Sequence, residues 1–391
     1  MFSELFLSLA LLLIYAKTFE SKPRKSKATS SSEKILYMTS ALKSAVIGTG
    51  VISKQHLSFL QASELANIVG VCDLSLAAAN YAANTFGATA AYTSYTEMLE
   101  KAKPDVVHIL TPPKTHFPIA TDCLKSGSHV ICEKPVAPSY TEFKDLWEIS
   151  KKCDRILLED HNYRFNSPVR AIKDMVAAGE LGDIQDVEIR IALNLRGGGR
   201  YADKNLPSPS HKMPAGVIHD FITHLSYLLL EFLPDIDFDR ISAAWSNHAG
   251  DDLFKYDDLD ALVIGSNGGH GRIRFSCYTA PDCFSLTVRG TKGYAETDLF
   301  QPYLRCVKPR SGGQQLSPLV NHFVNGWSLV GSSVRNFKNK VMQKTPYEGL
   351  HYLLGQTYAA MSVGQAPPIS FDDMARTSQL VEALLAEENR L

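Results

Sequence analysis

Residues 44–53 read SAVIGTGVIS, and this stretch decides the fold of the first half of the chain. Ser44–Ile47 predicts a short buried strand, and Ser53–Ala62 predicts a helix. Between them, Gly48 permits a tight turn and Gly50 lets a phosphate approach the backbone, while the helix N-terminus offers free N–H groups. A strand, a glycine turn and a helix in this order predict a dinucleotide-binding loop. The loop residues expected to face the cofactor are Gly48, Thr49, Gly50, Val51 and Ile52.

The acidic residue Asp73 ends the next predicted strand, Asn67–Cys72, and lies 23 residues after Gly50. A carboxylate at this position accepts hydrogen bonds from both ribose hydroxyls of NAD and repels the 2′-phosphate of NADP. Leu74 follows it, and no Arg or Lys stands close by to bind that phosphate. The sequence therefore predicts NAD as the cofactor and disfavours NADP. The alternative is that Asp73 only caps the following helix.

Further short apolar runs follow at Val106–Leu110, His129–Cys132 and Ile156–Leu158, and helical stretches separate them. Continuous apolar strands that alternate with helices are typical of a parallel sheet covered by helices on both faces. Repeated in this way, the unit predicts a doubly wound Rossmann domain.

Two polar motifs follow strands at the carboxyl edge of this predicted sheet, where a doubly wound fold binds its ligand. Thr111, Pro112 and His116 belong to TPPKTH, whose prolines favour an extended turn along the cofactor, although His116 can also be a solvated residue. Glu133 and Lys134 belong to EKP. Desolvation penalises a lysine at the tip of a buried strand unless its charge is used. Lys134 is therefore a candidate to stabilise a developing negative charge, with a plain surface lysine as the alternative.

The pattern of apolar and polar residues in the sequence changes beyond Arg164. Val169–Leu181 predicts a helix that ends at Gly182. Longer strands with alternating polarity follow at residues 186–193, 241–246, 261–266, 271–278 and 284–289. Period-two strands joined by tight turns predict a mainly antiparallel sheet. The expected fold class is α/β, with an N-terminal doubly wound Rossmann domain and a C-terminal α+β domain that contains a largely antiparallel open sheet.

Length and composition set the domain count and exclude several classes of protein. The 391 residues are 45% hydrophobic and 21% charged, which is typical of a globular chain. One core rarely grows beyond about 250–300 residues, so we expect two domains after a leader or linker at 1–41: a Rossmann domain at 42–163 and a second domain at 164–391. Substrate binding and oligomerisation are assigned to the second domain by the family resemblance described below. The net charge of −1 provides no field that attracts nucleic acid. Seven scattered cysteines without a C-x-x-C pair disfavour a disulfide framework and a zinc site, and favour a reducing compartment.

The N-terminal residues contain an apolar run, Leu5–Ala16, that is shorter than the about 20 residues of a membrane-spanning helix. It has the length of a signal-peptide core, but Glu4 precedes it where positive charge is expected, and a basic, Ser-rich stretch follows at Lys22–Lys34. Three interpretations stay open: an over-extended gene start with Met38 as the initiator, a signal or anchor through residues 1–16, or another leader. No stable membrane span is expected. A cytoplasmic location is favoured because a cofactor that must be reoxidised is scarce outside the cell.

Asp220 and His224 are four residues apart in the apolar helical segment GVIHDFITH, so they share one helix face and can interact. A carboxylate beside an imidazole orients it and raises its basicity, which suits a general base near neutral pH. A capping and packing pair is the alternative. Metal ligation by His219 and His224 is disfavoured, because the two are five residues apart and no further Cys or carboxylate completes a set. No metal is expected.

Taken together, these motifs resemble those of the Gfo/Idh/MocA oxidoreductases, the glucose–fructose oxidoreductase and inositol dehydrogenase superfamily. The resemblance runs from about residue 42 to the C-terminus. The matching stretches are AVIGTGVIS, VCD, TPPKTH, CEKP, HNYRF, ELGDI, GVIHDFITH, RGTKGYAET and PPISFDDMARTSQLVEAL. The sequence departs from the family at Ile222, where Gly is frequent, and at Tyr227, where Asp is frequent.

The resemblance implies which residues act. It assigns cofactor contacts to Gly48, Gly50 and Asp73, the lysine of the E-K-P motif to Lys134, and the family's D-x-x-x-H pair, whose His is the acid/base, to Asp220 and His224. It also makes the junction residues Asn162, Tyr163 and Arg164 candidates to bind substrate hydroxyls, and the irregular loop 197–212 a lining of the substrate site.

The function implied by the resemblance is an NAD(P)-dependent dehydrogenase or reductase, which transfers a hydride between nicotinamide and a secondary alcohol or ketone of a sugar, inositol or nucleotide sugar. His224 would take the hydroxyl proton, Asp220 would orient the imidazole and Lys134 would stabilise the alkoxide. Two alternatives stay open: an NAD-dependent glycosidase on the same fold, and a non-catalytic nucleotide-binding sensor. A homodimer or homotetramer is implied by the resemblance alone.

Overall fold

The computed structural model describes residues 41–199, 201–203, 208–250, 252–310, 313–342 and 347–387. The predicted leader up to residue 40, with Leu5–Ala16 and Met38, lies outside the described residues. Within the described ranges, no helix combines the length and the apolar character that crossing a membrane requires.

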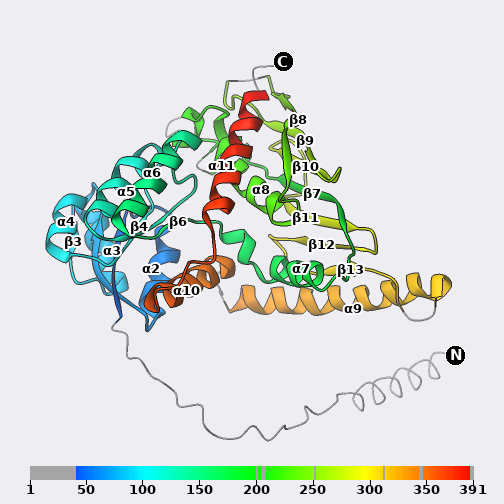
Figure 1. The fold of residues 1–391 in the computed structure, drawn as a ribbon, viewed down its shortest axis with the longest axis horizontal. Helices are drawn as coiled ribbons and strands as arrows, with labels where there is room; N and C mark the ends of the chain where they lie inside the picture. The colour runs from blue at the N-terminus through cyan, green and yellow to red at the C-terminus, as the bar shows by residue number, and fades with distance from the viewer. Residues whose placement is uncertain are drawn as a thin grey trace, which may run out of the picture. The chain divides into compact units, whose positions relative to one another are not determined.

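The first sheet has six parallel strands in the order β3-β2-β1-β4-β5-β6. Figure 1 shows its labelled strands β3, β4 and β6 among helices of the N-terminal half. The strands are β1 (Leu42–Ile47), β2 (Ala66–Cys72), β3 (Ala91–Tyr92), β4 (Val106–Ile109), β5 (His129–Cys132) and β6 (Leu157–Glu159). The helices that alternate with them are α2 (Ser53–Ala62), α3 (Leu76–Phe86), α4 (Tyr95–Ala102), α5 (His116–Lys125) and α6 (Tyr140–Cys153). The strand order runs outward in both directions from β1 and β4, so the carboxyl ends of these two strands open a crevice for a ligand.

The second sheet has seven strands in the order β13-β12-β11-β7-β10-β9-β8. β7 and β10 run parallel, and the other neighbouring strands run antiparallel. The strands are β7 (Ile184–Ala192), β8 (Ile236–Ser246), β9 (Asp258–Gly265), β10 (His270–Ser276), β11 (Cys283–Gly290), β12 (Tyr294–Asp298) and β13 (Arg305–Val307). In the chain, η2 (Asn162–Phe165) and α7 (Ser167–Ala177) lie between β6 and β7, and η3 (Pro209–Lys212), η4 (Gly216–Ile218) and α8 (His219–Phe232) lie between β7 and β8.

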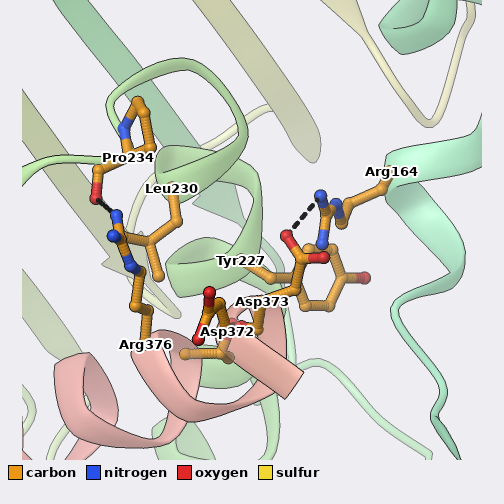
Figure 2. Close-up of a pocket in the computed structure, with 8 residues that line it drawn as sticks. Arg164, Tyr227, Leu230, Pro234, Asp372, Asp373 and Arg376 are labelled. Atoms are coloured by element: carbon orange, nitrogen blue, oxygen red, sulfur yellow. Dashed lines mark hydrogen bonds and ion pairs between the residues drawn. The ribbon is translucent and has the colours of Figure 1, made fainter. Parts of the chain in front are cut away.

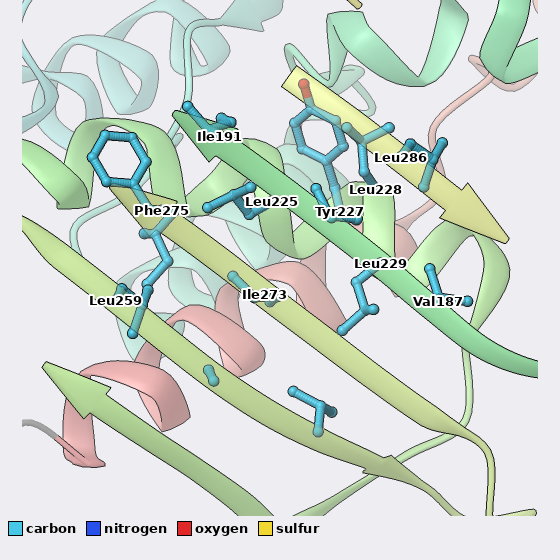
Figure 3. Close-up of a cluster of buried hydrophobic side chains, with 14 of the residues drawn as sticks. Val187, Ile191, Leu225, Tyr227, Leu228, Leu229, Leu259, Ile273, Phe275 and Leu286 are labelled. Atoms are coloured by element: carbon cyan, nitrogen blue, oxygen red, sulfur yellow. The ribbon is translucent and has the colours of Figure 1, made fainter. Parts of the chain in front are cut away.

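Helix α8 supplies the apolar face on which the second sheet packs. Leu225, Leu228 and Leu229 are fully buried and point toward the strands that carry Val187 and Ile273 (Figure 3). Burying a leucine side chain contributes about 1.5–3 kcal/mol. This packing fixes the rotation of α8 about its own axis and therefore the direction of its other face.

The C-terminal helices divide their contacts between the two sheets. α10 (Glu348–Ser362) places Leu350, Leu353 and Tyr358 in the buried cluster of the first sheet, whereas α11 (Phe371–Ala386) places Leu380 and Leu384 in that of the second. Residues near the C-terminus thus help to build the first core as well. The boundary predicted between residues 163 and 164 stays a prediction.

The predicted fold class is confirmed: a parallel Rossmann-type sheet is followed by a largely antiparallel one. Ser53–Ala62 and His129–Cys132 have the predicted bounds. The long helix α9 (Gly313–Val341) is not among the predicted elements. Pro318 and the glycines and asparagines within it lower helix propensity, so tertiary contacts rather than local preference support α9.

Replacing Gly349 by Ala should destabilise the protein. A Cβ on Gly349 would lie 2.1 Å from Asn166 Oδ1 and 2.4 Å from the Asn162 carbonyl oxygen. Helix α10 would have to move away from η2, which we expect to lower the free energy of unfolding by about 1–3 kcal/mol. Thermal unfolding measures the effect. The control is Gly355→Ala on the same helix, where the nearest atom, Phe59 Cε2, is 3.9 Å away and the melting temperature should stay equal or rise. Equal melting temperatures for the two variants would contradict this account.

Candidate functional site at the carboxyl edge of the first sheet

The turn between β1 and α2 has the backbone that its glycines predict. Gly48 has φ +97°, and a Cβ there would lie 2.7 Å from the Leu110 carbonyl oxygen, so this position requires glycine. Gly50 has no atom within 4 Å of an added Cβ, which leaves open space in front of its backbone. The turn therefore combines close packing behind Gly48 with an open approach at Gly50.

The N-terminus of α2 faces the same space and carries no side-chain cap. The N-cap residue Ile52 makes no capping hydrogen bond. Ser53 is buried, and its hydroxyl donates to the Gly50 carbonyl oxygen at 2.6 Å, which closes the turn. An uncapped helix N-terminus beside an open glycine turn fits the pyrophosphate of a dinucleotide.

Asp73 lies directly after β2 and is tied to the glycine turn. Its Oδ2 accepts hydrogen bonds from the Thr49 backbone N–H at 2.9 Å and the Thr49 hydroxyl at 2.7 Å, and its Oδ1 accepts from the Ser75 N–H at 2.9 Å. Burial raises the pKa of Asp73, but the hydrogen bonds from Thr49 and Ser75 outweigh it and lower the pKa below its ordinary value. The carboxylate is thus ionised and held beside the glycine turn, and its predicted contact with a ribose stays a prediction. Leu74 beside it is 96% exposed.

His116 connects two loops of this edge. The ring is fully buried, with Nδ1 2.7 Å from the Pro135 carbonyl oxygen and Nε2 2.6 Å from the Thr111 carbonyl oxygen. Burial lowers the pKa of His116, so the neutral ring donates to one of these carbonyls and only contacts the other. In this arrangement His116 positions the loops around Thr111 and Pro112, and its own predicted contact with the cofactor stays a prediction.

Lys134 and Asp220 form an ion pair between the two sheets. The Lys134 ammonium donates to Asp220 Oδ1 at 2.7 Å and to the Asp220 carbonyl oxygen at 2.5 Å. Asp220 Oδ2 accepts from the Tyr201 hydroxyl at 2.7 Å and the Ser210 hydroxyl at 2.9 Å, both in the loop predicted to line the site. Burial raises the pKa of Asp220, but Lys134 and the two hydroxyls lower it far below its ordinary range. The carboxylate is therefore ionised and fully used by its partners.

His224, one turn further along α8, has a different partner. Its Nδ1 lies 2.8 Å from the Tyr227 hydroxyl. Among the described residues no hydrogen bond joins Asp220 to His224, and the prediction that Asp220 orients the imidazole is wrong. The reason is that Lys134 reaches the carboxylate from the other sheet, and a charged donor is a stronger partner than an imidazole. Tyr227, noted in the sequence only as a departure from the family, orients His224 instead.

The hydrogen bonds of Tyr227 indicate which nitrogen of His224 carries the proton. The buried Tyr227 hydroxyl donates to Asn162 Oδ1 at 3.0 Å and accepts from the Tyr163 N–H at 3.2 Å. Because its single proton points to Asn162, the hydroxyl can only accept from His224 Nδ1–H. This assignment leaves Nε2 of His224 unprotonated. Burial first, and then the charge of Lys134, lower the pKa of His224 well below its ordinary value, so the ring is neutral near pH 7.

The three predicted substrate residues lie on η2, close to this histidine. Asn162 holds the Tyr227 hydroxyl, and the Tyr163 ring lies edge-on to His224 with 4.9 Å between ring centroids. The Arg164 guanidinium donates to Asp373 Oδ1 at 2.9 Å (Figure 2). It forms a second ion pair with Glu231. Arg164 thereby ties α8 to α11 beside a cavity of about 100 Å³. Its role toward a substrate stays a prediction.

Behind the edge lies a largely buried cluster of His56, Glu133 and Asp160. His56 and Asp160 were not predicted, and the cofactor contact predicted for Glu133 stays a prediction. His56 Nε2 is 3.6 Å from Glu133 Oε1 and 3.7 Å from Asp160 Oδ2. Burial, and then the charge of Glu133, raise the pKa of Asp160 well above its ordinary value, whereas His56 and Lys134 bring the pKa of Glu133 down to about 2 against the opposing effect of burial. One carboxyl group of the cluster is thus neutral and the other ionised. The available signal was the position of Asp160 directly after a buried strand, the same signal that identified Lys134.

Comparison with known proteins places the chain among oxidoreductases. The family model GFO_IDH_MocA (oxidoreductase family, NAD-binding Rossmann fold) matches residues 42–161, and the model of the GFO/IDH/MocA C-terminal domain matches residues 169–296. The chain is 29% identical over 182 residues to D-glucoside 3-dehydrogenase of Escherichia coli (strain K12). This alignment covers 46% of this chain and 52% of that protein. It is 25% identical over 316 residues to trans-1,2-dihydrobenzene-1,2-diol dehydrogenase of Mus musculus. This second alignment covers 78% of this chain and 91% of that protein. The first of these alignments thus spans only about half of the relative.

Solved structures have the same fold. Levoglucosan dehydrogenase in complex with NADH superimposes with a TM-score of 0.72 at 17% identity, covering 90% of this chain and 97% of that one. Myo-inositol 2-dehydrogenase from Lactobacillus plantarum gives a TM-score of 0.69 at 19% identity, with coverage of 90% and 98%. At these identities the likeness shows the fold alone.

Cofactor choice should depend on Asp73 and Leu74. Asp73→Ser combined with Leu74→Arg removes the charge that repels a 2′-phosphate and adds a cation that binds it. The ratio of the NADPH and NADH dissociation constants, measured by fluorescence, should shift toward NADPH by at least about tenfold, or about 1.4 kcal/mol. Leu74→Arg alone is the control and should shift the ratio less. A wild-type chain that already prefers NADPH would refute the role of Asp73.

Proposed function

The chain belongs to the Gfo/Idh/MocA family of oxidoreductases, which have an NAD-binding Rossmann fold, and from this premise we propose that it is an NAD-dependent dehydrogenase acting on a secondary alcohol of a sugar, inositol or nucleotide sugar. One observation carries the proposal: the paired ammonium of Lys134 and the neutral imidazole of His224 lie together beside the cofactor crevice. Relatives named D-glucoside 3-dehydrogenase and dTDP-3,4-didehydro-2,6-dideoxy-alpha-D-glucose 3-reductase support the choice of substrate class.

The residues at the crevice fit NAD. The open turn at Gly50 and the uncapped N-terminus of α2 would hold the pyrophosphate, and the Asp73 carboxylate would accept the ribose hydroxyls. When bound, NAD supplies the acceptor for a hydride. The side chains of this protein would supply the base and the positive charge that the reaction also needs.

His224 is proposed as the base. The hydroxyl proton of the alcohol passes to Nε2, while the C–H hydrogen leaves with its electron pair and a ketone remains. Tyr227 keeps the proton on Nδ1 and so keeps the Nε2 lone pair available. General-base help of this kind contributes about 10²–10⁴-fold to the rate.

Lys134 is proposed to stabilise the oxygen from which the proton is taken. Its side chain is 11% exposed and its ammonium is held by Asp220, so it is oriented before a substrate arrives. A fixed cation in a water-poor site stabilises a developing alkoxide far more than bulk water does. Asp220 is thus a positioning residue for Lys134.

A screen of sugars, inositols and nucleotide sugars with purified protein, monitored by NADH absorbance, tests the reaction class. Formation of NADH in proportion to the oxidised product is the expected result. Cleavage of a glycoside without net NADH would indicate an NAD-dependent glycosidase instead. NADH binding without turnover of any compound would favour a nucleotide sensor.

The variant Lys134→Met should distinguish a catalytic role of Lys134 from a role in folding. It keeps the aliphatic stem and removes the charge, so packing changes little. We expect kcat to fall by about 10²–10³, the size of losing one electrostatic donor, while NADH affinity stays within about threefold. Lys114→Met, at an exposed lysine of the same sheet edge, is the matched control and should keep full activity. Normal turnover by Lys134→Met would contradict the mechanism, and its unfolding would indicate a structural role.

The pH profile should report the lowered pKa of His224. The neutral ring is the active form, and a pKa below the ordinary 6.5 keeps it neutral at lower pH. For alcohol oxidation, kcat/KM should therefore fall on the acid side only below pH 6.5. In Lys134→Met a positive charge that opposes protonation is absent, so the acid limb should move to higher pH. An acid limb that does not move would show that Lys134 and His224 do not share one site.

A further inference from the structure

The cluster of His56, Glu133 and Asp160 brings three possible metal ligands together from three different elements. His56 lies on α2, Glu133 follows β5 and Asp160 follows β6. One atom of each, a ring nitrogen or a carboxylate oxygen, lies within 4.8 Å of the other two. The sequence disfavoured a metal on His219 and His224, and neither of these residues belongs to this set. We call the three residues the His56 cluster.

Two members of the His56 cluster have buried polar atoms that are not hydrogen-bonded. The side chains of His56 and Asp160 are 0% and 1% exposed. Among the described residues, His56 Nε2 and both carboxyl oxygens of Asp160 lack a hydrogen-bond partner. A buried polar group without a partner costs roughly 1–3 kcal/mol, and more when it is charged. Three such atoms in one place indicate an occupant that supplies what the side chains do not.

The hydrogen bonds behind His56 indicate that its Nε2 carries a lone pair. The Ser44 hydroxyl donates to the Leu42 carbonyl oxygen at 3.1 Å, so it accepts from the Tyr358 hydroxyl 2.7 Å away. The Tyr358 hydroxyl has no second proton and therefore accepts from His108 Nε2–H at 2.8 Å. His108 is fully buried and neutral, so its Nδ1 accepts from His56 Nδ1–H at 2.8 Å. A neutral His56 is thus left with a bare Nε2, which faces the two carboxyl groups of the cluster.

The spacing of the three atoms fits a shared ion better than hydrogen bonds. His56 Nε2 lies 3.6 Å from Glu133 Oε1 and 3.7 Å from Asp160 Oδ2. An N–H···O hydrogen bond spans about 2.7–3.2 Å, so neither contact is one. Two ligands of a tetrahedral ion with bonds of about 2.0–2.2 Å lie roughly 3.3–3.6 Å apart. The His56 cluster therefore has nearly the spacing of a coordination site.

The ligand set indicates the class of metal. One imidazole nitrogen and two carboxylate oxygens suit Zn²⁺, whereas Ca²⁺ takes about six to eight oxygen ligands and Mg²⁺ prefers oxygen alone. The set contains no thiolate or thioether, which a soft ion such as Cu(I) would need. Two positive charges also balance the two carboxylates, while the nearby Lys134 is already paired with Asp220.

We propose that the His56 cluster binds one Zn²⁺ ion, with His56 Nε2, Glu133 Oε1 and Asp160 Oδ2 as its ligands. Three protein ligands leave one position of a tetrahedral ion for a water molecule. The Glu133 side chain is 16% exposed, so an ion can reach the cluster past it. The ion joins α2 to the ends of β5 and β6 and thereby stabilises the edge that carries Lys134. It takes no part in the proposed hydride transfer.

A proton is the competing occupant of the His56 cluster. Shared between Glu133 and Asp160, it would also reduce the negative charge of the cluster. It would leave the lone pair of His56 Nε2 without a partner, however, because Asp160 Oδ2 is too far away to donate to it. Only a metal ion contacts all three atoms at once.

Zinc titration of the full chain, purified without a histidine tag and stripped with a chelator, tests the proposal. Isothermal titration calorimetry should show one Zn²⁺ ion bound per chain, and added Zn²⁺ should raise the melting temperature. Co²⁺ at the same site should give a visible d–d spectrum without an intense thiolate band, because no cysteine belongs to the set.

The variants Asp160→Asn and Glu133→Gln each remove the charge of one ligand and keep the size of its side chain. Loss of an outer-shell partner already costs about 10–100-fold in metal affinity, so loss of a ligand should cost at least about 100-fold. The matched control is Asp145→Asn, at an exposed carboxylate of α6, which should bind Zn²⁺ like the wild type. If circular dichroism shows that Asp160→Asn does not fold, Glu133→Gln, with its partly exposed side chain, gives the same comparison.

Two results would overturn the proposal. The first is a stripped wild type that binds no Zn²⁺ and keeps its melting temperature when Zn²⁺ is added, which would show that the cluster holds a proton only. The second is a Zn²⁺ affinity that Asp160→Asn and Glu133→Gln leave unchanged, which would show an adventitious ion elsewhere on the chain. Neither result involves turnover, so both leave the proposed function as it stands.

Discussion

The ammonium of Lys134 and the carboxylate of Asp220 meet at 2.7 Å, where the first sheet ends and the helix that covers the second sheet begins. Both side chains are largely removed from water, at 11% and 19% exposure. Such a pair is stable only when further hydrogen bonds offset the loss of hydration, and Asp220 gains these from Tyr201 and Ser210. Loss of either partner would leave an unpaired charge in the crevice. The ion pair therefore joins the first sheet to helix α8 at the edge where we propose the active site.

The packing of helix α8 against the second sheet sets the positions of the site residues on its other face. Its leucines are buried against the second sheet, and this determines where Asp220 and His224 point on the other side. Because Asp220 is held by Lys134, the imidazole needs a separate support, and Tyr227 from the same helix provides it. The Tyr227 hydroxyl is neutral, since burial raises its pKa well above the ordinary value, so it orients His224 without adding a charge.

Helix α9 covers one edge of the second sheet. At the edge formed by β13, side chains of α9 pair with the strand backbone, which removes a row of free N–H and carbonyl groups that would otherwise invite another strand. The cost of this arrangement is that α9 must turn its apolar residues outward. The protected sheet edge and the outward direction of the apolar residues of α9 are thus two results of the same contact.

The amino-acid sequence by itself determined the elements whose signals are local. The glycine turn at Gly48 and Gly50, the acid Asp73 after an apolar strand and the lysine after β5 could be found because tight turns, strand ends and burial each restrict the residue type. Alternating polarity in the second half likewise predicted the antiparallel sheet. Only the tertiary structure decided which side chains meet across the chain. The four-residue spacing of Asp220 and His224 allowed them to interact, but it carried no information on Lys134, 86 residues earlier, which competes for the carboxylate. The contact of His56 with Asp160 was equally hidden, because contacts between distant segments depend on how the sheets and helices pack and leave no periodic pattern in the sequence.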